Sequence, residues 1–558
     1  MRKYTLIVLA SSCLASGTGN YLNAQTKQIE KNHKETSKVS KDNQKPTEVS
    51  NISDAEKIFF VLNKVQFVHG KSLTEEEKNQ PFKNYIGKRI SVSKFRSLVN
   101  ELNAIYLSKG LILSHAYIPP QKARNGIIKI ILVEGSINKL YIKGKLAPEI
   151  RAKIETIMRP VLKQNPLRNR ELEHAKLLIN DLPGISARSI ISPNKDEKLK
   201  ANITILVEQK DFQFGLHSDN YLNRLDGAMR LGANFIRHNF IPGTSFAVSV
   251  GQAINPNRNN YFKTYAKYFL GDMGDSILFS YLHLKNRPNY SAIGFPVSPN
   301  EIGITKLWHI DISHPVILNR QYKQKVEFGI SRNNTILSDN SGLKFSDTVA
   351  SIDLSSSMNF IALLDGQNSL TLTWSRGLGH ALGAQDDKSS RPNAKLNYTK
   401  VNVDYQYQKD ITPQLHLSFH TIGQLGFSPL LASQEFSAGG QACGIGYDPG
   451  ELIGDSGVCA HTQMNYILPK AKDLGLNYWY GFSFYDHAYI KNQPDGQNTI
   501  LTDNADSFGV GLYMSISKKF SWQALYALPL NHVVALEKQA DNSKAYKGRV
   551  FFMAHYSE

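Results

Sequence analysis

The sequence predicts an α+β N-terminal part followed by an all-β barrel that spans a membrane. Three observations lead to this fold class. The chain opens with an apolar run behind two basic residues, as exported proteins do. Two consecutive segments of about 75 residues then show the same order of strands and helices. From Asp211 to the end, apolar and polar residues alternate and no helical pattern returns.

The first 24 residues form the predicted signal peptide. Met1-Arg2-Lys3 precedes the apolar run Tyr4–Ala10, and cleavage is expected after Ala24. A lipidation site at Cys13 is the alternative. Residues 25–54 contain too few apolar side chains to fold alone, so we predict a polar linker there, with room for a short plug helix.

Residues 55–135 are predicted to form the first α+β unit. Strands are expected over Phe60–Val68, Ile112–Ile118 and Gly126–Val133. A helix is expected over Ser93–Lys109, because its apolar residues share one face. These residues are Phe95, Leu98, Val99, Leu102, Ile105 and Tyr106.

Residues 136–210 repeat this pattern. Leu140–Ile142 and Asn202–Val207 are the expected strands, and Ile150–Leu162 and Glu171–Asn180 are the expected helices. A pattern that recurs at this period indicates an internal repeat of one supersecondary unit.

Residues 211–558 carry the strand signal. Phe508, Val510 and Leu512 alternate with small or polar residues, and polar stretches such as 386–393 separate the strands. Strands of about ten residues that alternate in this way, behind a signal peptide, are typical of a transmembrane β-barrel. A secreted sandwich or β-helix has a similar periodicity and is the soluble alternative.

Charge and motifs argue against several functions. The net charge is +18, or +16 without the signal peptide, but the basic residues are spread out and form no nucleic-acid-binding module. Gly454–Gly457 looks like a protease nucleophile segment but has no base or orienting partner. His416 and His420 lie on an expected strand, too far apart for one metal ion. We therefore expect no enzyme activity, no metal and no cofactor.

The most informative segment is a glycine-rich, nearly uncharged loop at about 436–462. Cys443 and Cys459 flank its centre. In an exported protein, two cysteines this close favour a disulfide, although two separate thiols remain the alternative. A disulfide would close a ring of 17 residues.

The two α+β units resemble POTRA domains, which are periplasmic modules that bind unfolded polypeptide. The resemblance rests on short motifs in both units and on the spacing between them. The matching positions are Gly87, Tyr106, Gly110, Pro119, Gln121 and Gly135 in the first unit, and Asp181, Pro183 and Gly184 in the second. From about residue 55 to 558, the chain resembles the two-partner-secretion transporters, which export haemolysins and haemagglutinins.

This resemblance implies two POTRA domains in the periplasm and a barrel of 16 antiparallel strands in the outer membrane of a Gram-negative bacterium. It also implies a monomer that touches outer-membrane lipid and lipopolysaccharide. Its POTRA domains would bind one large partner exoprotein, a haemolysin or adhesin, which passes through the barrel without ATP. A barrel-assembly insertase is the alternative, and an adhesin-like barrel without transport is a third.

The resemblance also assigns roles within the glycine-rich loop. The matching loop positions are Gly439, Gly440, Ile445, Gly446, Tyr447 and Asp448, and the facing strand carries Phe484 and Asp486. In the family, an arginine at the tip pairs with the strand aspartate, but here the tip residue is Ile445. We therefore expect Asp486 to lack a charge-assisted partner worth about 1.5–3 kcal/mol, with reduced transport or a different loop anchor as the consequence. A Cys443–Cys459 disulfide could then hold the loop instead.

Overall fold

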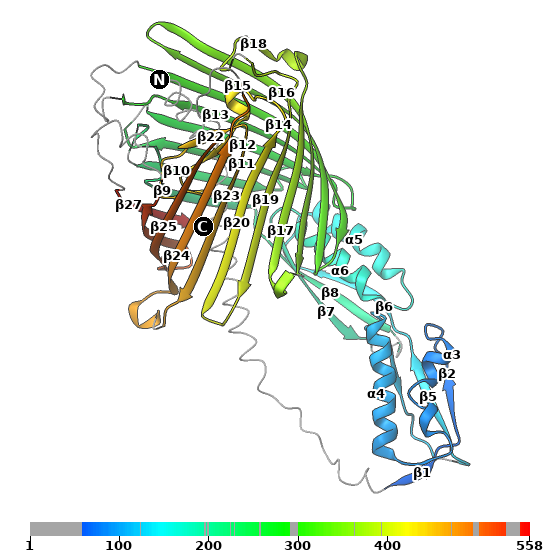
Figure 1. Ribbon diagram of the computed structural model, residues 1–558. Helices are drawn as coiled ribbons and strands as arrows, with labels where there is room; N and C mark the ends of the chain where they lie inside the picture. The colour runs from blue at the N-terminus through cyan, green and yellow to red at the C-terminus, as the bar shows by residue number, and fades with distance from the viewer. Residues whose placement is uncertain are drawn as a thin grey trace.

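The computed structural model describes residues 58–558, except for 123, 195–196, 198–199, 224, 228, 256–257, 291–299, 362, 392, 470, 495–501 and 532–546. The predicted signal peptide and linker lie outside the described residues. Two small α+β units precede a large barrel. The second unit lies at one end of the barrel, and the first lies farther away from it (Figure 1).

The first unit packs helix α4 against a three-stranded sheet. Its elements are β1 (Phe59–Val61), β2 (Lys64–Val68), α3 (Glu75–Asn79), the 3-10 turn η1 (Lys83–Tyr85), β3 (Arg89–Ser91), α4 (Val92–Ser108), β4 (His115–Tyr117) and β5 (Ile127–Val133). The Ser91 side chain caps α4 by accepting a hydrogen bond from Lys94 N at 3.1 Å. The apolar face predicted for this helix is buried against the sheet, apart from the half-buried Ile105.

Two strand predictions in this unit need correction. The stretch Phe60–Val68 is not one strand, because β1 and β2 belong to different sheets: β1 pairs with β3, and β2 pairs with β5. The strand expected over Ile112–Ile118 is limited to β4. The Asn103 side chain bonds the backbone N and O of Ala116 there, at 2.6 and 3.2 Å, so one edge of β4 is already occupied.

The second unit repeats the topology of the first. Its elements are β6 (Ser136–Lys143), α5 (Pro148–Leu162), α6 (Asn169–Asp181), β7 (Ile185–Pro193) and β8 (Lys200–Gln209). In both units the first strand of the sheet pairs in parallel with the last, which pairs antiparallel with the strand before it. The predicted internal repeat is therefore visible in the sheets, although β7 was missed at the sequence level. No helix in the described part of the chain is long and apolar enough to cross a membrane.

The remaining strands close into an antiparallel barrel. Sixteen long strands form its wall in the part of the chain that the structure describes, and the short β18 lies beside β16. The strands are β9 (Phe212–Asp219), β10 (Arg230–His238), β11 (Thr244–Ala253), β12 (Asn259–Phe269), β13 (Ser276–Asn286), β14 (Ile302–Leu318), β15 (Tyr322–Asp339), β16 (Gly342–Ile361), β17 (Gln367–Gly377), β18 (Gln385–Lys388), β19 (Thr399–Asp410), β20 (Leu415–Gly426), β23 (Ser456–Ile467), β24 (Tyr478–Lys491), β25 (Thr502–Ser515), β26 (Phe520–Pro529) and β27 (Arg549–Ser557). The last strand pairs with the first, placing Tyr556 opposite Leu216. This closure excludes the sandwich and the β-helix.

The two faces of the wall differ in polarity. Large apolar side chains on the strands are exposed on the outside, among them Leu231, Phe235, Phe246, Phe279, Ile310, Phe328, Leu354, Phe508 and Val510. Buried polar side chains alternate with them, among them Ser276, Thr305, Ser351, Gln463 and Ser515. An apolar exterior around a polar interior is the arrangement of a barrel that stands in lipid.

Direct bonds fix the second unit to the near end of the barrel. Lys153 of α5 donates to the carbonyl oxygen of Phe269 at 2.6 Å, and burial at this contact lowers the pKa of Lys153. Glu173 of α6 forms an ion pair with Arg320 at 3.1 Å. The second unit therefore has a set orientation at this end of the barrel.

Candidate functional site

The loop between β20 and β23 folds back into the barrel. It spans residues 427–455, so it begins and ends earlier than the predicted 436–462. A small hairpin of β21 (Phe436–Ala438) and β22 (Leu452–Gly454) carries the tip inward. Residues 438–448 are all buried. The loop therefore packs against the interior of the barrel instead of projecting into solvent.

The glycines of the loop let its backbone fold on itself and approach the wall. Gly439 N donates to Cys443 O at 3.0 Å, and Gly440 N donates to Tyr447 O at 3.1 Å. A Cβ atom added at Gly446 would lie 2.9 Å from Ser507 Cβ. Only a residue without a side chain fits this close to β25, so Gly446 allows the tip to lie against the wall.

Asp486 is the acceptor that holds the tip. Its side chain is fully buried on β24 and accepts hydrogen bonds from the Ile445 backbone N at 2.8 Å and from Ser507 Oγ at 2.7 Å. The ring nitrogen Nδ1 of His461 lies 2.6 Å from its other oxygen. The aspartate thus binds both the loop backbone and the wall on either side of it.

The expectation that Asp486 lacks a charge-assisted partner is therefore wrong. His461 stands directly opposite Asp486 in the pairing of β23 with β24 and is the partner that the aspartate was expected to lack. Nothing in the sequence pointed to His461, because it becomes a neighbour of Asp486 only through the strand register. Phe484 is also buried, and its ring lies 5.5 Å from the His461 ring.

The isoleucine at the tip has a packing role. Ile445 is 4% exposed and lies in a cluster of buried, mainly aromatic residues inside the barrel. The other members are Tyr221, Ile467, Tyr478, Tyr480, Phe482, Phe484, Tyr513, Leu525, Ala527 and Phe551. The departure from arginine therefore comes with an apolar site for the side chain that replaces it.

Tyr447 and Asp448 fix the far side of the tip. The Tyr447 hydroxyl donates to the carbonyl oxygen of Asp506 at 2.7 Å. The buried Asp448 forms an ion pair with Arg549 of β27 at 3.0 Å. Here the carboxylate comes from the loop and the arginine from the wall, which is the reverse of the arrangement that the family resemblance implied. Sequence reasoning missed Arg549 because it lies about a hundred residues downstream.

The base of the loop is held by Arg391. This arginine is 2% exposed and pairs with Asp455 at 2.6 Å and with Glu435 at 3.1 Å. It also donates to the carbonyl oxygens of Leu430 and Gln493. Residues 386–393 were expected only to separate two strands. The structure instead places a short strand and the main anchor of the loop base there.

A disulfide joins Cys443 to Cys459, with the Cα atoms 6.0 Å apart. Cys459 lies on β23 and therefore outside the loop, which corrects its predicted place within the loop segment 436–462. The bond therefore ties the loop tip to the wall itself. In the chain-entropy account, closing a ring of this size contributes roughly 3 kcal/mol.

Replacing both cysteines by serine is expected to loosen the tip without unseating it, because Asp486 and Arg549 still hold it. In planar bilayers we expect the open probability of the channel to rise by less than it does when Asp486 is removed. Mass spectrometry of a non-reduced digest should show peptides containing Cys443 and Cys459 linked. Two free thiols in protein taken directly from outer membranes would contradict the tether.

Several POTRA-like motif positions lie where the two units meet. The Gly110 carbonyl accepts a hydrogen bond from Asn169 N at 2.7 Å, and the Gly135 carbonyl accepts one from Leu167 N at 2.9 Å. Tyr106 is fully buried in the first core, and burial raises the pKa of its phenol. The two backbone hydrogen bonds to Gly110 and Gly135 fix the relative placement of the two units.

Other motif positions shape loops within the first unit. The Gln121 side chain bonds the backbone of Lys129 in both directions, at 2.6 and 2.9 Å, and so holds the segment that follows Pro119 against β5. Gly87 lies in the turn before β3 with a positive φ of 78°. Both are structural positions within their unit.

The remaining motif positions lie at the barrel contact. Asn239, between β10 and β11, donates to the carbonyl oxygen of Pro183 at 2.7 Å. At Gly184 the φ angle is +64°, and an added Cβ would lie 2.1 Å from Lys210 O, so a glycine is required. Asp181 ends α6 and interacts electrostatically with three lysines of the barrel strands.

Two sequence features mimic a metal site and a protease site. In the structure, their polar residues pair with other side chains of the barrel. His416 Nδ1 lies 2.5 Å from Asp410, and His420 Nε2 lies 3.2 Å from Asp404. Asp455, in the protease-like segment, is the Arg391 partner described above. Among the described residues there is no group of three or more His, Cys, Asp or Glu that could hold a metal ion.

A known protein family matches most of the barrel sequence. The family model described as haemolysin secretion/activation protein ShlB/FhaC/HecB matches residues 202–502, more than half of the chain. The chain belongs to this family. The POTRA domain model of ShlB type matches residues 60–135.

Individual relatives agree with this assignment. The heme/hemopexin transporter protein HuxB of Haemophilus influenzae (strain 86-028NP) is 23% identical over 506 residues, covering 88% of this chain and 86% of HuxB. The outer membrane transporter CdiB of Dickeya dadantii (strain 3937) is 20% identical over 495 residues, covering 86% of this chain and 84% of that CdiB. The predicted resemblance to two-partner-secretion transporters is therefore confirmed.

Solved structures show the same fold. CdiB from Escherichia coli superposes with a TM-score of 0.71 at 15% identity, covering 97% of this chain and 99% of CdiB. BamA from Haemophilus ducreyi lacking POTRA domains 1–3 has a TM-score of 0.51 at 12% identity, covering 89% of this chain and 100% of that structure. The transporter thus lies in the outer membrane of a Gram-negative bacterium, with its POTRA domains in the periplasm.

Proposed function

We propose that this transporter exports one large partner protein of the haemolysin or adhesin type, and that it does so without ATP. The observation that carries the proposal is the loop seated in the barrel. Its tip is bound by Asp486 and Arg549, its base is bound by Arg391, and a disulfide ties it to β23. A lumen occupied by a loop held at its tip and base is suited to a channel that opens only for its cargo.

The partner would first bind the POTRA domains. Strands β2 and β7 each pair with only one other strand, so each leaves one edge unpaired within its described sheet. An extended segment of the partner would add as a further strand at such an edge, where main-chain hydrogen bonds give affinity. The chain would then enter the lumen once the loop shifts. Folding of the partner outside the cell would make its exit irreversible, so no nucleotide is needed.

The transporter would act as a monomer, with its exposed apolar wall in contact with outer-membrane lipid and lipopolysaccharide. The closed barrel contains every pairing its strands need, so assembly with a second copy is not required to complete the wall.

The proposal is tested with the purified transporter in liposomes that contain no nucleotide. The cargo is the large secreted protein encoded beside it, supplied unfolded on the POTRA side and labelled with a fluorophore. In vesicles whose POTRA domains face outward, we expect labelled cargo to move into the vesicle and become protected there. Protein-free liposomes are the control.

Two results would count against the proposal. If the cargo crosses only when ATP is present, the proposal that export needs no ATP is contradicted. A transporter that leaves this cargo behind but speeds the insertion of an unfolded outer-membrane barrel would instead support the assembly-factor alternative.

A further inference from the structure

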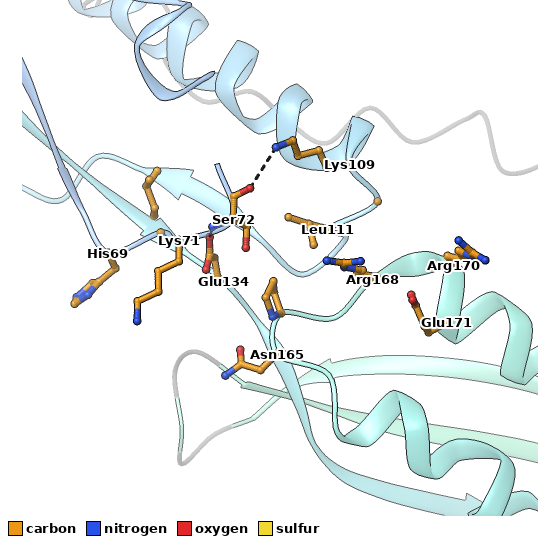
Figure 2. A pocket seen from close by; sticks show the side chains of 14 residues that line it. His69, Lys71, Ser72, Lys109, Leu111, Glu134, Asn165, Arg168, Arg170 and Glu171 are labelled. Carbon is orange, nitrogen blue, oxygen red and sulfur yellow. Dashed lines mark hydrogen bonds between the residues drawn. The ribbon is translucent and has the colours of Figure 1, made fainter. Parts of the chain in front are cut away.

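A cavity of about 1050 Å³ lies between the two POTRA domains. Figure 2 shows its walls: the loop after β2 with Lys71, the end of α4 with Lys109, and the start of α6 with Arg168 and Arg170. Backbone hydrogen bonds from the second domain to Gly110 and Gly135 hold these walls together. The cavity is therefore a fixed part of the junction.

The net charge around this cavity is positive. Of the four cations, Lys109 already pairs with Glu77 at 2.6 Å, and this hydrogen bond keeps the pKa of Glu77 below its usual value. Lys71, Arg168 and Arg170 are exposed and form no ion pair with any described residue. The amino end of α6 adds positive potential at the same place. These three cations outnumber the two carboxylates of the cavity wall, and such an excess of positive charge attracts an anionic ligand.

Two carboxylates in the wall narrow the class of ligand. Glu134 is already used, because its Oε1 accepts a hydrogen bond from Ser72 N at 2.7 Å. Glu171 Oε2 is buried and accepts no hydrogen bond from any described residue. A ligand that satisfies Glu171 must bring a donor as well as negative charge. An extended peptide has both along its length, in its backbone N–H groups and its acidic side chains, whereas a phosphate ion has no donor apart from its own protonated oxygens.

The floor of the cavity also suits a peptide. Leu111 and Leu132 line it, and both are buried in the core of the first domain. The apolar floor, the cationic rim and the Glu171 oxygen that accepts no hydrogen bond together match an extended segment that carries acidic and apolar side chains.

We propose that the cavity binds an acidic, extended segment of the exported partner. This inference rests on the proposed export function. It adds a second contact for the partner, besides the strand that the partner adds at a sheet edge. Lys71, Arg168 and Arg170 bind its carboxylates, and Glu171 accepts a backbone N–H. The acidic segment would hold the partner at the bend between the domains while a sheet edge pairs with its neighbouring residues.

The test uses the full chain in detergent micelles and a fluorescein-labelled peptide of ten residues that alternates glutamate with leucine. Replacing Lys71, Arg168 and Arg170 by alanine should raise the Kd at least tenfold. The matched control replaces Lys88, Lys143 and Lys145, which are exposed on the same two domains but do not line the cavity. It should leave the Kd within twofold. A peptide with glutamine in place of glutamate should bind neither protein.

Equal weakening by both triple variants, or none by the first, would overturn the proposal. So would complete displacement of the peptide by inorganic phosphate or by anionic vesicles at matched charge, because the cavity would then recognise phosphate. The export assay separates this inference from the proposed function. Normal export by the cavity variant contradicts only the acidic-segment site, whereas no export by the wild-type transporter contradicts the function itself.

Discussion

Replacing Asp486 by alanine is expected to detach the loop tip from β24 and β25, so that it moves about its disulfide to β23, and to raise the open probability of the purified channel at least tenfold. The fully buried carboxylate accepts from the Ile445 backbone, from Ser507 and from His461. Its removal leaves three buried groups without their acceptor, each at a cost of about 1–3 kcal/mol. Because the Ile445 N–H belongs to the loop and the other two groups belong to the wall, the seated state loses its main polar contact.

Single-channel recording in planar bilayers measures this effect. Asp353→Ala is the matched control, since Asp353 is an inward-facing carboxylate of β16 that accepts from Ser375 at 2.5 Å and has no loop contact. The open probability of the Asp353→Ala channel should be that of the wild type. Asp486→Asn should be intermediate, because an amide oxygen still accepts from the loop. If Asp486→Ala and Asp353→Ala behave alike, the tip is held by the disulfide and Arg549, and Asp486 is not its anchor.

Replacing Arg391 by alanine is expected to release the base of the loop towards the cell exterior. Asp455 and Glu435 would then lose the cation that they share, and breaking a buried pair in this way costs about 3–5 kcal/mol. The loop can avoid this cost by moving these groups into water. Glu435 should then become accessible, although its side chain is only 5% exposed in the seated loop.

A glutamate-specific protease added to intact cells reports this movement. Cleavage after Glu435 should be at least ten times faster than in the wild type, seen as two fragments on a reducing gel. Arg376→Ala is the control, because Arg376 is an exposed arginine of β17 whose bond to Thr399 lies outside the loop. Resistance of the Arg391 variant to the protease, with the protein present in the membrane, would show that the base is held by other contacts.

The sequence determined the architecture because architecture follows from local periodicity. The period of two after Asp211 predicts strands with one apolar face, and sixteen of them close the barrel. The helical face of 93–109 predicts a helix buried on a sheet, as α4 is. The density of glycines at the loop predicts close backbone contacts, and the short spacing of Cys443 and Cys459 in an exported protein favours the disulfide that joins them.

Only the tertiary structure decided how the loop is held. His461 meets Asp486 through the register of β23 with β24, and Arg391 reaches Asp455 across 64 residues of sequence. Asp448 meets Arg549 because the last strand closes the barrel beside the first. Each pair depends on which strands become neighbours and on their register, and a one-residue shift would turn each strand partner to the opposite face of the wall. Periodicity predicts which residues form strands, but barrel closure brings these charges together.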